Sequence, residues 1–121
     1  MTYAGLKSYI YANMNREDPR FKAALGWIKD NYTLSENPGI GQAGLYYYYV
    51  VFARTFSLLG EKTIVDGKHV SRDWYDELST ELLSRQNAQG FWQNAESSRW
   101  WEGSSSLCTA YAILALSEGP E

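Results

Sequence analysis

Segments that carry almost no charge alternate along this chain with segments that are polar on one side, and this alternation strongly constrains the fold. Residues 2–14, 42–59 and 104–117 contain one lysine, one arginine and no charged residue, respectively. Between them, 18–32 and 71–86 place apolar side chains on one helical face and most charged side chains elsewhere. Uncharged helices are expected to be buried on most sides, whereas amphipathic helices keep one face in water. The pattern predicts an all-α fold of about five helices, with buried inner helices alternating with amphipathic outer ones.

Local signals support these helix boundaries. Asp18-Pro19 is a favourable helix start, because Asp is a good N-cap and Pro is tolerated at the first helical position. Gly60 is a natural C-terminal stop, and the serines at 104–106 offer N-caps for the last helix. Strand signals are weak, so 62–70 and 87–103 are predicted to be loops.

Composition narrows the class of protein. The chain of 121 residues is 45% hydrophobic and carries a net charge of -3, which indicates one globular domain with its own core. The negative charge and the lack of a Lys/Arg cluster argue against a nucleic-acid partner. The longest apolar stretch, 45–52, is too short to form a transmembrane segment. The single cysteine leaves the cellular compartment undetermined.

One segment carries a specific motif. Residues 81–92, with Gln86, Gly90 and Trp92, resemble the repeat motif of the squalene-cyclase and protein-prenyltransferase family, in which an outer helix ends at Gln before a turn, Gly, one residue and Trp. Residues 109–116 resemble the inner helix of that family. An earlier repeat is degenerate, since Asn31 stands where Gln is expected.

The resemblance implies a partial α/α toroid over residues 1–121, made of about two and a half helical hairpins. It also implies that Gln86, Gly90 and Trp92 form a structural clamp between adjacent outer helices, because Gly permits the turn that lets the indole fold back. An incomplete ring leaves apolar edges bare. Either the chain belongs to a longer protein, or open arcs self-associate through those edges.

Aromatic residues provide the candidate ligand site. Four consecutive tyrosines, 46–49, cover all sides of a helix, so only one or two can line a cavity. In the resembled family, loops like the one before the last helix rim the cavity. Aromatic linings suit apolar or cationic ligands, and a carboxyl group withdrawn from water beside indoles could act as an acid. The expected ligand-binding residues are Gln42, Tyr46, Trp100, Trp101, Glu102 and Tyr111.

The sequence predicts no catalytic residue, metal site or cofactor. The Asp-x-Asp-Asp motif of the family's cyclases is absent, and the acidic cluster 73–77 faces solvent on a helix. Nothing in the spacing brings Cys108 and His69 together as zinc ligands. We therefore expect a non-catalytic scaffold or binding module, whose partner is an apolar small molecule or a protein. Two alternatives are a fragment of a terpene-cyclase- or prenyltransferase-like enzyme, with its catalytic residues outside this chain, and a carbohydrate-processing toroid.

Overall fold

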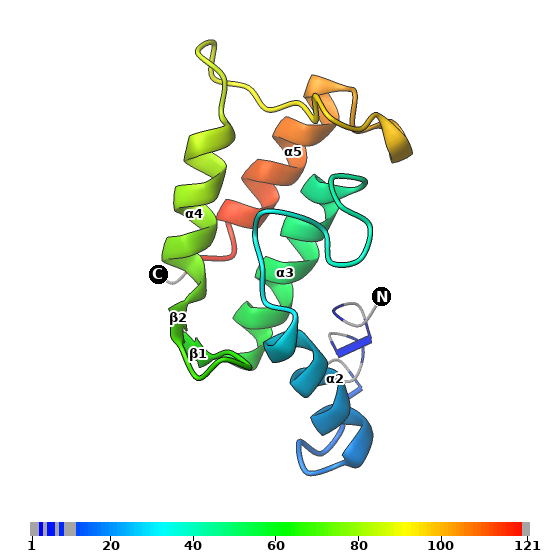
Figure 1. Ribbon diagram of the computed structural model, residues 1–121, viewed down its shortest axis with the longest axis vertical. Helices are drawn as coiled ribbons and strands as arrows, with labels where there is room; N and C mark the ends of the chain where they lie inside the picture. The colour runs from blue at the N-terminus through cyan, green and yellow to red at the C-terminus, as the bar shows by residue number, and fades with distance from the viewer. Residues whose placement is uncertain (1–2, 4, 7, 9–11, 120–121) are drawn as a thin grey trace.

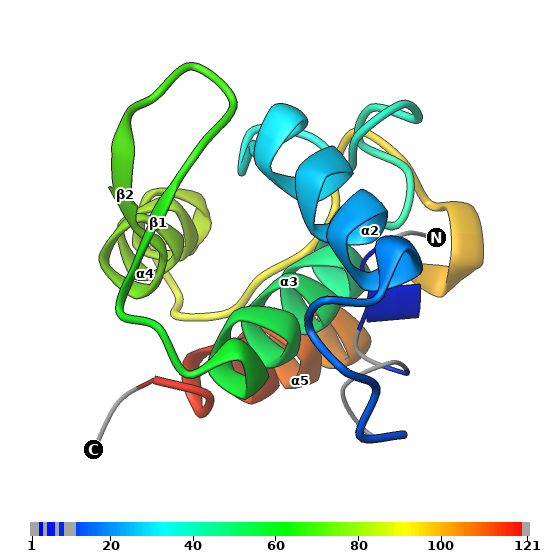
Figure 2. The same cartoon turned by 90° about the horizontal axis from the view of Figure 1, so that it is seen from below.

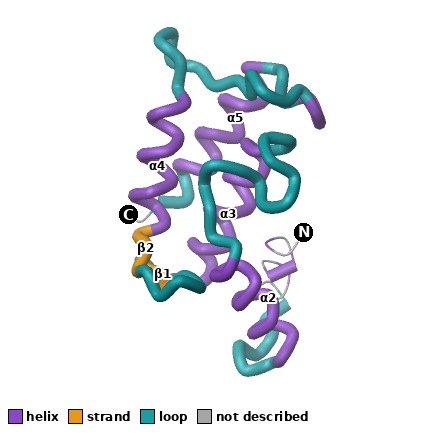
Figure 3. The backbone as a smooth tube through the Cα atoms, viewed as in Figure 1, coloured by secondary structure: helices purple, strands orange, loops and turns teal. Residues whose placement is uncertain are grey.

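The computed structural model describes residues 3, 5, 6, 8 and 12–119 (Figure 1). Its helices lie around one aromatic core, and a short hairpin joins two of them (Figure 3). The elements in chain order are α2 (Pro19–Asp30), α3 (Leu45–Leu59), β1 (Thr63–Val65), β2 (Ser71–Asp73), α4 (Trp74–Arg85), the single 3₁₀ turn η1 (Arg99–Trp101) and α5 (Ser105–Leu116).

Helix α3 is the centre of the fold. Eleven of its fifteen residues are buried, because α4 and α5 pack against it and α2 crosses it (Figure 2). The ring centres of Phe52 and Phe56 lie 4.7 Å apart. The rings of Tyr32 and Trp74, which lie outside α3, pack against them. Edge-to-face ring pairs of this kind add to the stabilisation that burial of their apolar area supplies.

The helix ends follow from local chemistry. The Asp18 carboxylate accepts the N–H of Arg20 and caps α2, and the Ser104 hydroxyl accepts the N–H of Leu107 at the start of α5. Gly60 adopts a left-handed conformation and ends α3. These ends match the predicted ones to within a residue. The start of α3 does not, because left-handed Gly44 delays it from residue 42 to Leu45.

The prediction of an all-α fold is wrong. Residues 62–70 were expected to be a loop and 71–86 a helix, but β1 and β2 form an antiparallel hairpin with Thr63 opposite Asp73, which makes the fold mixed α/β. Residues 71–73 therefore belong to β2, and the helix predicted from residue 71 begins at Trp74. Three successive β-branched residues, Thr63–Val65, favour extended backbone. The Asp66 carboxylate accepts the N–H groups of Lys68 and Val70 and so closes the turn between the strands.

The toroid prediction is also wrong: the described residues form four α-helices and a hairpin, without the concentric layers of about five helices. Helix α5 is uncharged, yet only Cys108, Ala112 and Ala115 are buried, and Ile113 remains 57% exposed. Two helices, α3 and α4, pack against α5, and they cover only one of its faces. Of the predicted helix 2–14, the structure describes residues 3, 5, 6, 8 and 12–14: the first four are helical, with Tyr3 and Leu6 buried, whereas 12–14 are not helical. Among the described helices, none combines the length and apolarity that crossing a membrane requires.

Candidate functional site

The loop before α5 is fixed to the start of α3 by one buried carboxylate. Glu102 is fully buried, and its two oxygens accept the backbone N–H groups of Tyr46 at 3.0 Å and Tyr47 at 2.9 Å. The Asn94 side chain donates to the same carboxylate at 3.1 Å and to the Gln42 carbonyl at 2.6 Å. A helix N-terminus exposes unpaired N–H groups with partial positive charge, so a carboxylate is a strong cap there.

A second set of contacts connects this loop to α5. The backbone N–H of Asn94 donates to the Glu102 carbonyl at 3.0 Å, and the Cys108 thiol donates to the same oxygen at 3.1 Å. Burial raises the pKa of the Cys108 thiol to about 11, which keeps it in the neutral donor form. The loop is therefore attached to both helices that it faces.

Two tryptophans in this loop have unusual backbone geometry. Trp100 and Trp101 have φ angles of 54° and 69°, in the left-handed region that bulky residues rarely adopt. The guanidinium of Arg99 lies 4.3 Å from the centre of the Trp100 ring. A Cβ atom on Gly44 would come within 2.9 Å of the Trp100 indole, so this ring needs a glycine beneath it. The strained backbone thus presents one indole against the start of α3.

An aromatic cleft opens beside Trp100. It has a volume of about 340 Å³ and lies between the start of α3, the loop before α5 and Tyr111 in the middle of α5. The rings of Tyr47 and Tyr111 meet edge to face with their centres 5.9 Å apart. Burial and the nearby Glu102 carboxylate raise the pKa of Tyr111. The lining residues are Asn37, Ile40, Gly44, Tyr47, Trp100, Glu102 and Tyr111.

The structure divides the predicted ligand residues among different places. Trp100, Glu102 and Tyr111 line the aromatic cleft together, as a cavity rim would require. Trp101 lines none of the described clefts and is 84% exposed. Tyr47, which was not among the predicted ligand residues, also lines the aromatic cleft. The run of tyrosines 46–49 indicated that one of them would line a cavity. Which one does so depends on the rotation of α3 about its axis, which the sequence does not determine.

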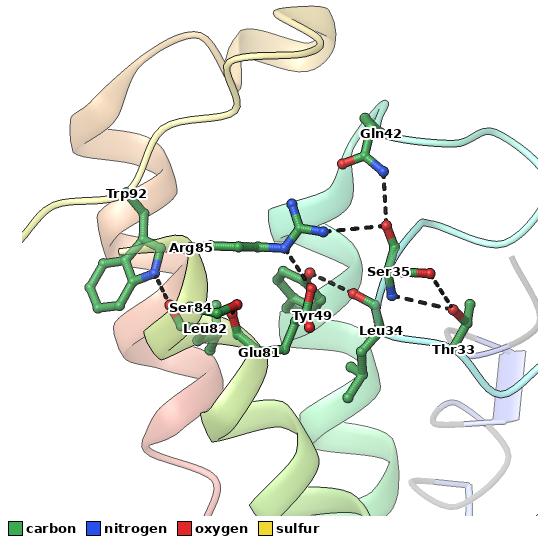
Figure 4. A network of polar contacts seen from close by, with 10 residues as sticks. All are labelled: Thr33, Leu34, Ser35, Gln42, Tyr49, Glu81, Leu82, Ser84, Arg85 and Trp92. Atoms are coloured by element: carbon green, nitrogen blue, oxygen red, sulfur yellow. Dashed lines mark hydrogen bonds and ion pairs between the residues drawn. The ribbon is translucent and has the colours of Figure 1, made fainter. Parts of the chain in front are cut away.

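Gln42 and Tyr46 line a separate polar cleft of about 190 Å³, together with Arg85. Burial raises the pKa of Tyr46 to about 12. Figure 4 shows the contacts beside it: Arg85 pairs with Glu81 at 2.8 Å and reaches the Ser35 carbonyl, which also accepts the Gln42 amide at 2.8 Å. Because these groups already bond to one another, the contacts beside the polar cleft hold α4 against the loop before α3.

The motif residues act within the structure as connectors. The Gln86 amide donates to the Gly90 carbonyl at 2.9 Å, and Gly90 has a left-handed φ of 93°. Trp92 donates its indole N–H to the Leu82 carbonyl at 2.8 Å, and its backbone N–H to Thr109 on α5. The motif therefore joins the end of α4 to α5, while Gln86 bonds within its own turn.

A larger cleft of about 440 Å³ lies at the opposite end of α3, against the start of α4. Its two main rings have their polar atoms occupied, since Trp74 donates to the Glu61 carbonyl and Tyr75 to the Leu116 carbonyl. In the aromatic cleft, by contrast, two of the lining rings are open to solvent, since Trp100 is 53% and Tyr47 is 44% exposed. We therefore select the aromatic cleft as the candidate site, although it is the smaller one.

The residues considered as zinc ligands lie apart. Cys108 is buried in α5 near the aromatic cleft, whereas His69 is exposed in the hairpin turn beyond the other end of α3. Within the described part of the chain, no three His, Cys, Asp or Glu side chains gather closely enough to hold a metal ion.

Comparisons of the chain with models of protein families, with curated proteins and with solved structures found no match. The chemistry of the site therefore follows from its own geometry.

Proposed function

We propose that this protein is a non-catalytic binding module whose aromatic cleft holds an apolar group of a ligand or partner. The observation that carries the proposal is the convergence of Tyr47, Trp100 and Tyr111, from three separate segments, on one open cleft. Its volume of about 340 Å³ falls within the usual range of ligand pockets. Aromatic walls with a few polar groups are the usual composition of such pockets.

Backbone strain supports the same proposal. Two adjacent tryptophans in left-handed conformations cost roughly 1–3 kcal/mol each, and such strain tends to persist where function requires it. Folding alone gains little from these side chains, since Trp100 is 53% and Trp101 is 84% exposed. A bound apolar group would cover Trp100 and recover hydrophobic free energy that folding leaves unused.

The carboxylate of the cleft favours binding over catalysis. Glu102 is the single acidic residue among the described residues that line the aromatic cleft. Both of its oxygens accept N–H groups from α3, so the group serves as a helix cap and is not poised to exchange protons with a ligand. Membership of the squalene-cyclase and prenyltransferase repeat family stays a prediction, carried by the motif Gln86, Gly90 and Trp92.

Fluorescence of 1-anilinonaphthalene-8-sulfonate (ANS), an aromatic probe that brightens in apolar sites, tests the proposal. We expect the full chain to bind this probe, and Trp100→Ala to weaken its affinity by at least about tenfold, because the substitution removes one wall of the cleft. Circular dichroism of each variant shows whether it is folded. Trp27→Ala is the matched control, since Trp27 is 40% exposed on α2 and lies away from the cleft.

The proposal requires that the two tryptophan variants differ. Probe affinity that is unchanged in folded Trp100→Ala, or that falls equally in Trp27→Ala, would place binding elsewhere and overturn it.

A further inference from the structure

Helix α5 turns small side chains toward the core and large apolar ones toward solvent. Its buried residues are Cys108, Ala112 and Ala115, whereas Ile113 is 57% and Leu114 is 41% exposed. A helix that packs on a core normally directs its large apolar side chains inward, because they gain most from leaving water. Packing against α3 and α4 therefore accounts for only one side of α5.

The outward side of α5 carries a regular line of residues. Successive residues of a helix advance by about 100°, so positions separated by four, three and four residues share one face. Four exposed residues have this spacing, namely Ser106, Ala110, Ile113 and Ser117. We call them the α5 seam. No charged residue occurs in 103–117, although a helix face that stays in water usually carries charge. The α5 seam is therefore suited to contact with another helix.

We infer that two copies of the chain associate through the α5 seam, with their α5 helices antiparallel about a two-fold axis. Such an interface must be complementary to itself. In the antiparallel arrangement Ile113 of each copy packs over Ala110 of the other, and Ser106 lies opposite Ser117. Large side chains then meet small ones, as ridges fit into grooves. A parallel arrangement would instead set Ile113 against Ile113.

The charges at the two ends of the helix favour the same arrangement. Apart from the buried Glu102, the nearest charged residues are Arg99 before the uncharged stretch and Glu118 after it. Glu118 pairs with Arg54 at 3.5 Å and keeps 29% of its side chain exposed. Antiparallel helices bring opposite charges and opposite dipole ends together, whereas parallel helices bring like charges together.

The size of the α5 seam sets the strength of the dimer. Helix α5 has 12 residues and is therefore about 18 Å long. One helix of this length covers less than the roughly 800 Å² per copy that a stable dimer buries. The dimer is therefore weak and concentration-dependent, with an expected dissociation constant between about 10 μM and 1 mM.

Sedimentation equilibrium of the full chain tests the association. The mean mass should rise from 13.8 kDa toward twice that value as the concentration increases through this range. Ile113→Glu should weaken the dimer by at least about tenfold, because it places one charge from each copy in the seam. Val65→Glu is the matched control, since Val65 is 50% exposed on the hairpin, which lies on the far side of α3 from α5 (Figure 2).

The inference requires that the two glutamate variants differ while circular dichroism shows both to be folded. A wild-type mass that stays at 13.8 kDa up to about 2 mM, above the range expected for a small interface, would overturn it. Equal weakening by Val65→Glu would do the same, because association would then not depend on the α5 seam.

Disulfide formation tests the antiparallel order. Ser106→Cys and Ser117→Cys place thiols at opposite ends of the α5 seam, and the native Cys108 is buried and cannot compete. A mixture of the two variants should form the mixed disulfide faster than either variant forms a disulfide with itself, because only the mixed pair is adjacent in an antiparallel dimer. Faster self-linking of either variant would contradict the arrangement.

Discussion

The carboxylate of Glu102 and the backbone N–H of Tyr47 form a 2.9 Å hydrogen bond that joins positions 55 residues apart in the chain. Its other oxygen accepts the N–H of Tyr46, so a single buried side chain caps α3 and holds the loop that bears Trp100. The aromatic cleft therefore exists because of a contact between distant segments. Removing that contact should affect both stability and binding.

Glu102→Gln should lower the free energy of unfolding by about 2 kcal/mol, because an amide NH₂ replaces an oxygen that accepts a backbone N–H, and a charge-assisted bond is lost. Urea denaturation measures the change. Glu96→Gln in the same loop, where the side chain is exposed, is the control and should stay within about 0.5 kcal/mol. Equal stability of the two variants would show that Glu102 is not the cap described here.

Alanine substitutions at Gly44 and Gly26 should change the free energy of unfolding in opposite directions. Gly44→Ala should destabilise the protein by about 1–2 kcal/mol, since its φ is 66° and the new Cβ would press on the Trp100 indole. Gly26→Ala, inside α2 with open space around the position, should instead stabilise by about 0.5–1 kcal/mol. Thermal and urea unfolding of both variants check the pair. Two changes of the same sign would contradict this account of the start of α3.

Trp92→Phe should cost about 1 kcal/mol, because it removes the indole N–H that satisfies the Leu82 carbonyl near the end of α4 and leaves the ring burial largely intact. Trp27→Phe is the matched substitution at an exposed position, and we expect less than about 0.5 kcal/mol there. Both values come from urea denaturation. A loss at Trp92 no larger than that at Trp27 would show that the indole hydrogen bond contributes nothing to the clamp.

The hairpin should loosen in acid. The N–H of Val70 first, and then Arg72 and the N–H of Lys68, hold the pKa of Asp66 below its ordinary value near 4. A carboxyl group whose pKa is lowered by folding stabilises the native state above its unfolded pKa and loses that contribution as pH falls through its folded pKa. The protection of the Lys68 and Val70 amides, measured relative to their intrinsic exchange rates at the same pH, should therefore fall below about pH 4. Asp66→Ala, which removes the accepting oxygen, should show low protection at all pH values, and wild-type protection that persists in acid would contradict the assignment.

Local signals predicted the helices well where their cause is local. The Asp18 and Ser104 caps and the Gly60 stop act within one turn, so the ends of α2, α3 and α5 follow from neighbouring residues. The hairpin escaped notice because each strand has only three residues, too few for a visible alternation. Its stabilising contacts, from Asp66 to Arg72 and Val70, become evident only once the turn is closed.

Burial was harder to predict than helix formation. The uncharged α5 was taken to be an inner helix, yet the sequence does not say how many neighbours a helix has, and α5 keeps Ile113 and Leu114 exposed. The candidate site shows the same limit. Trp100, Glu102 and Tyr111 were selected as a group, but the choice of Tyr46 over Tyr47 required the rotation of α3. The hydrogen bonds between Glu102 and the start of α3 join residues about 55 positions apart, so no local sequence pattern predicts them.

Nuclear magnetic resonance of the tryptophan indole N–H groups tests the central claim, that the aromatic cleft is the binding site, most directly. The chain has five tryptophans, so each ¹⁵N-labelled indole is a separate reporter. During titration with ANS, the Trp100 indole signal should shift in proportion to occupancy while the signals of Trp27 and Trp74 stay in place. A titration in which Trp100 does not move, or in which Trp27 moves as far, would contradict the account.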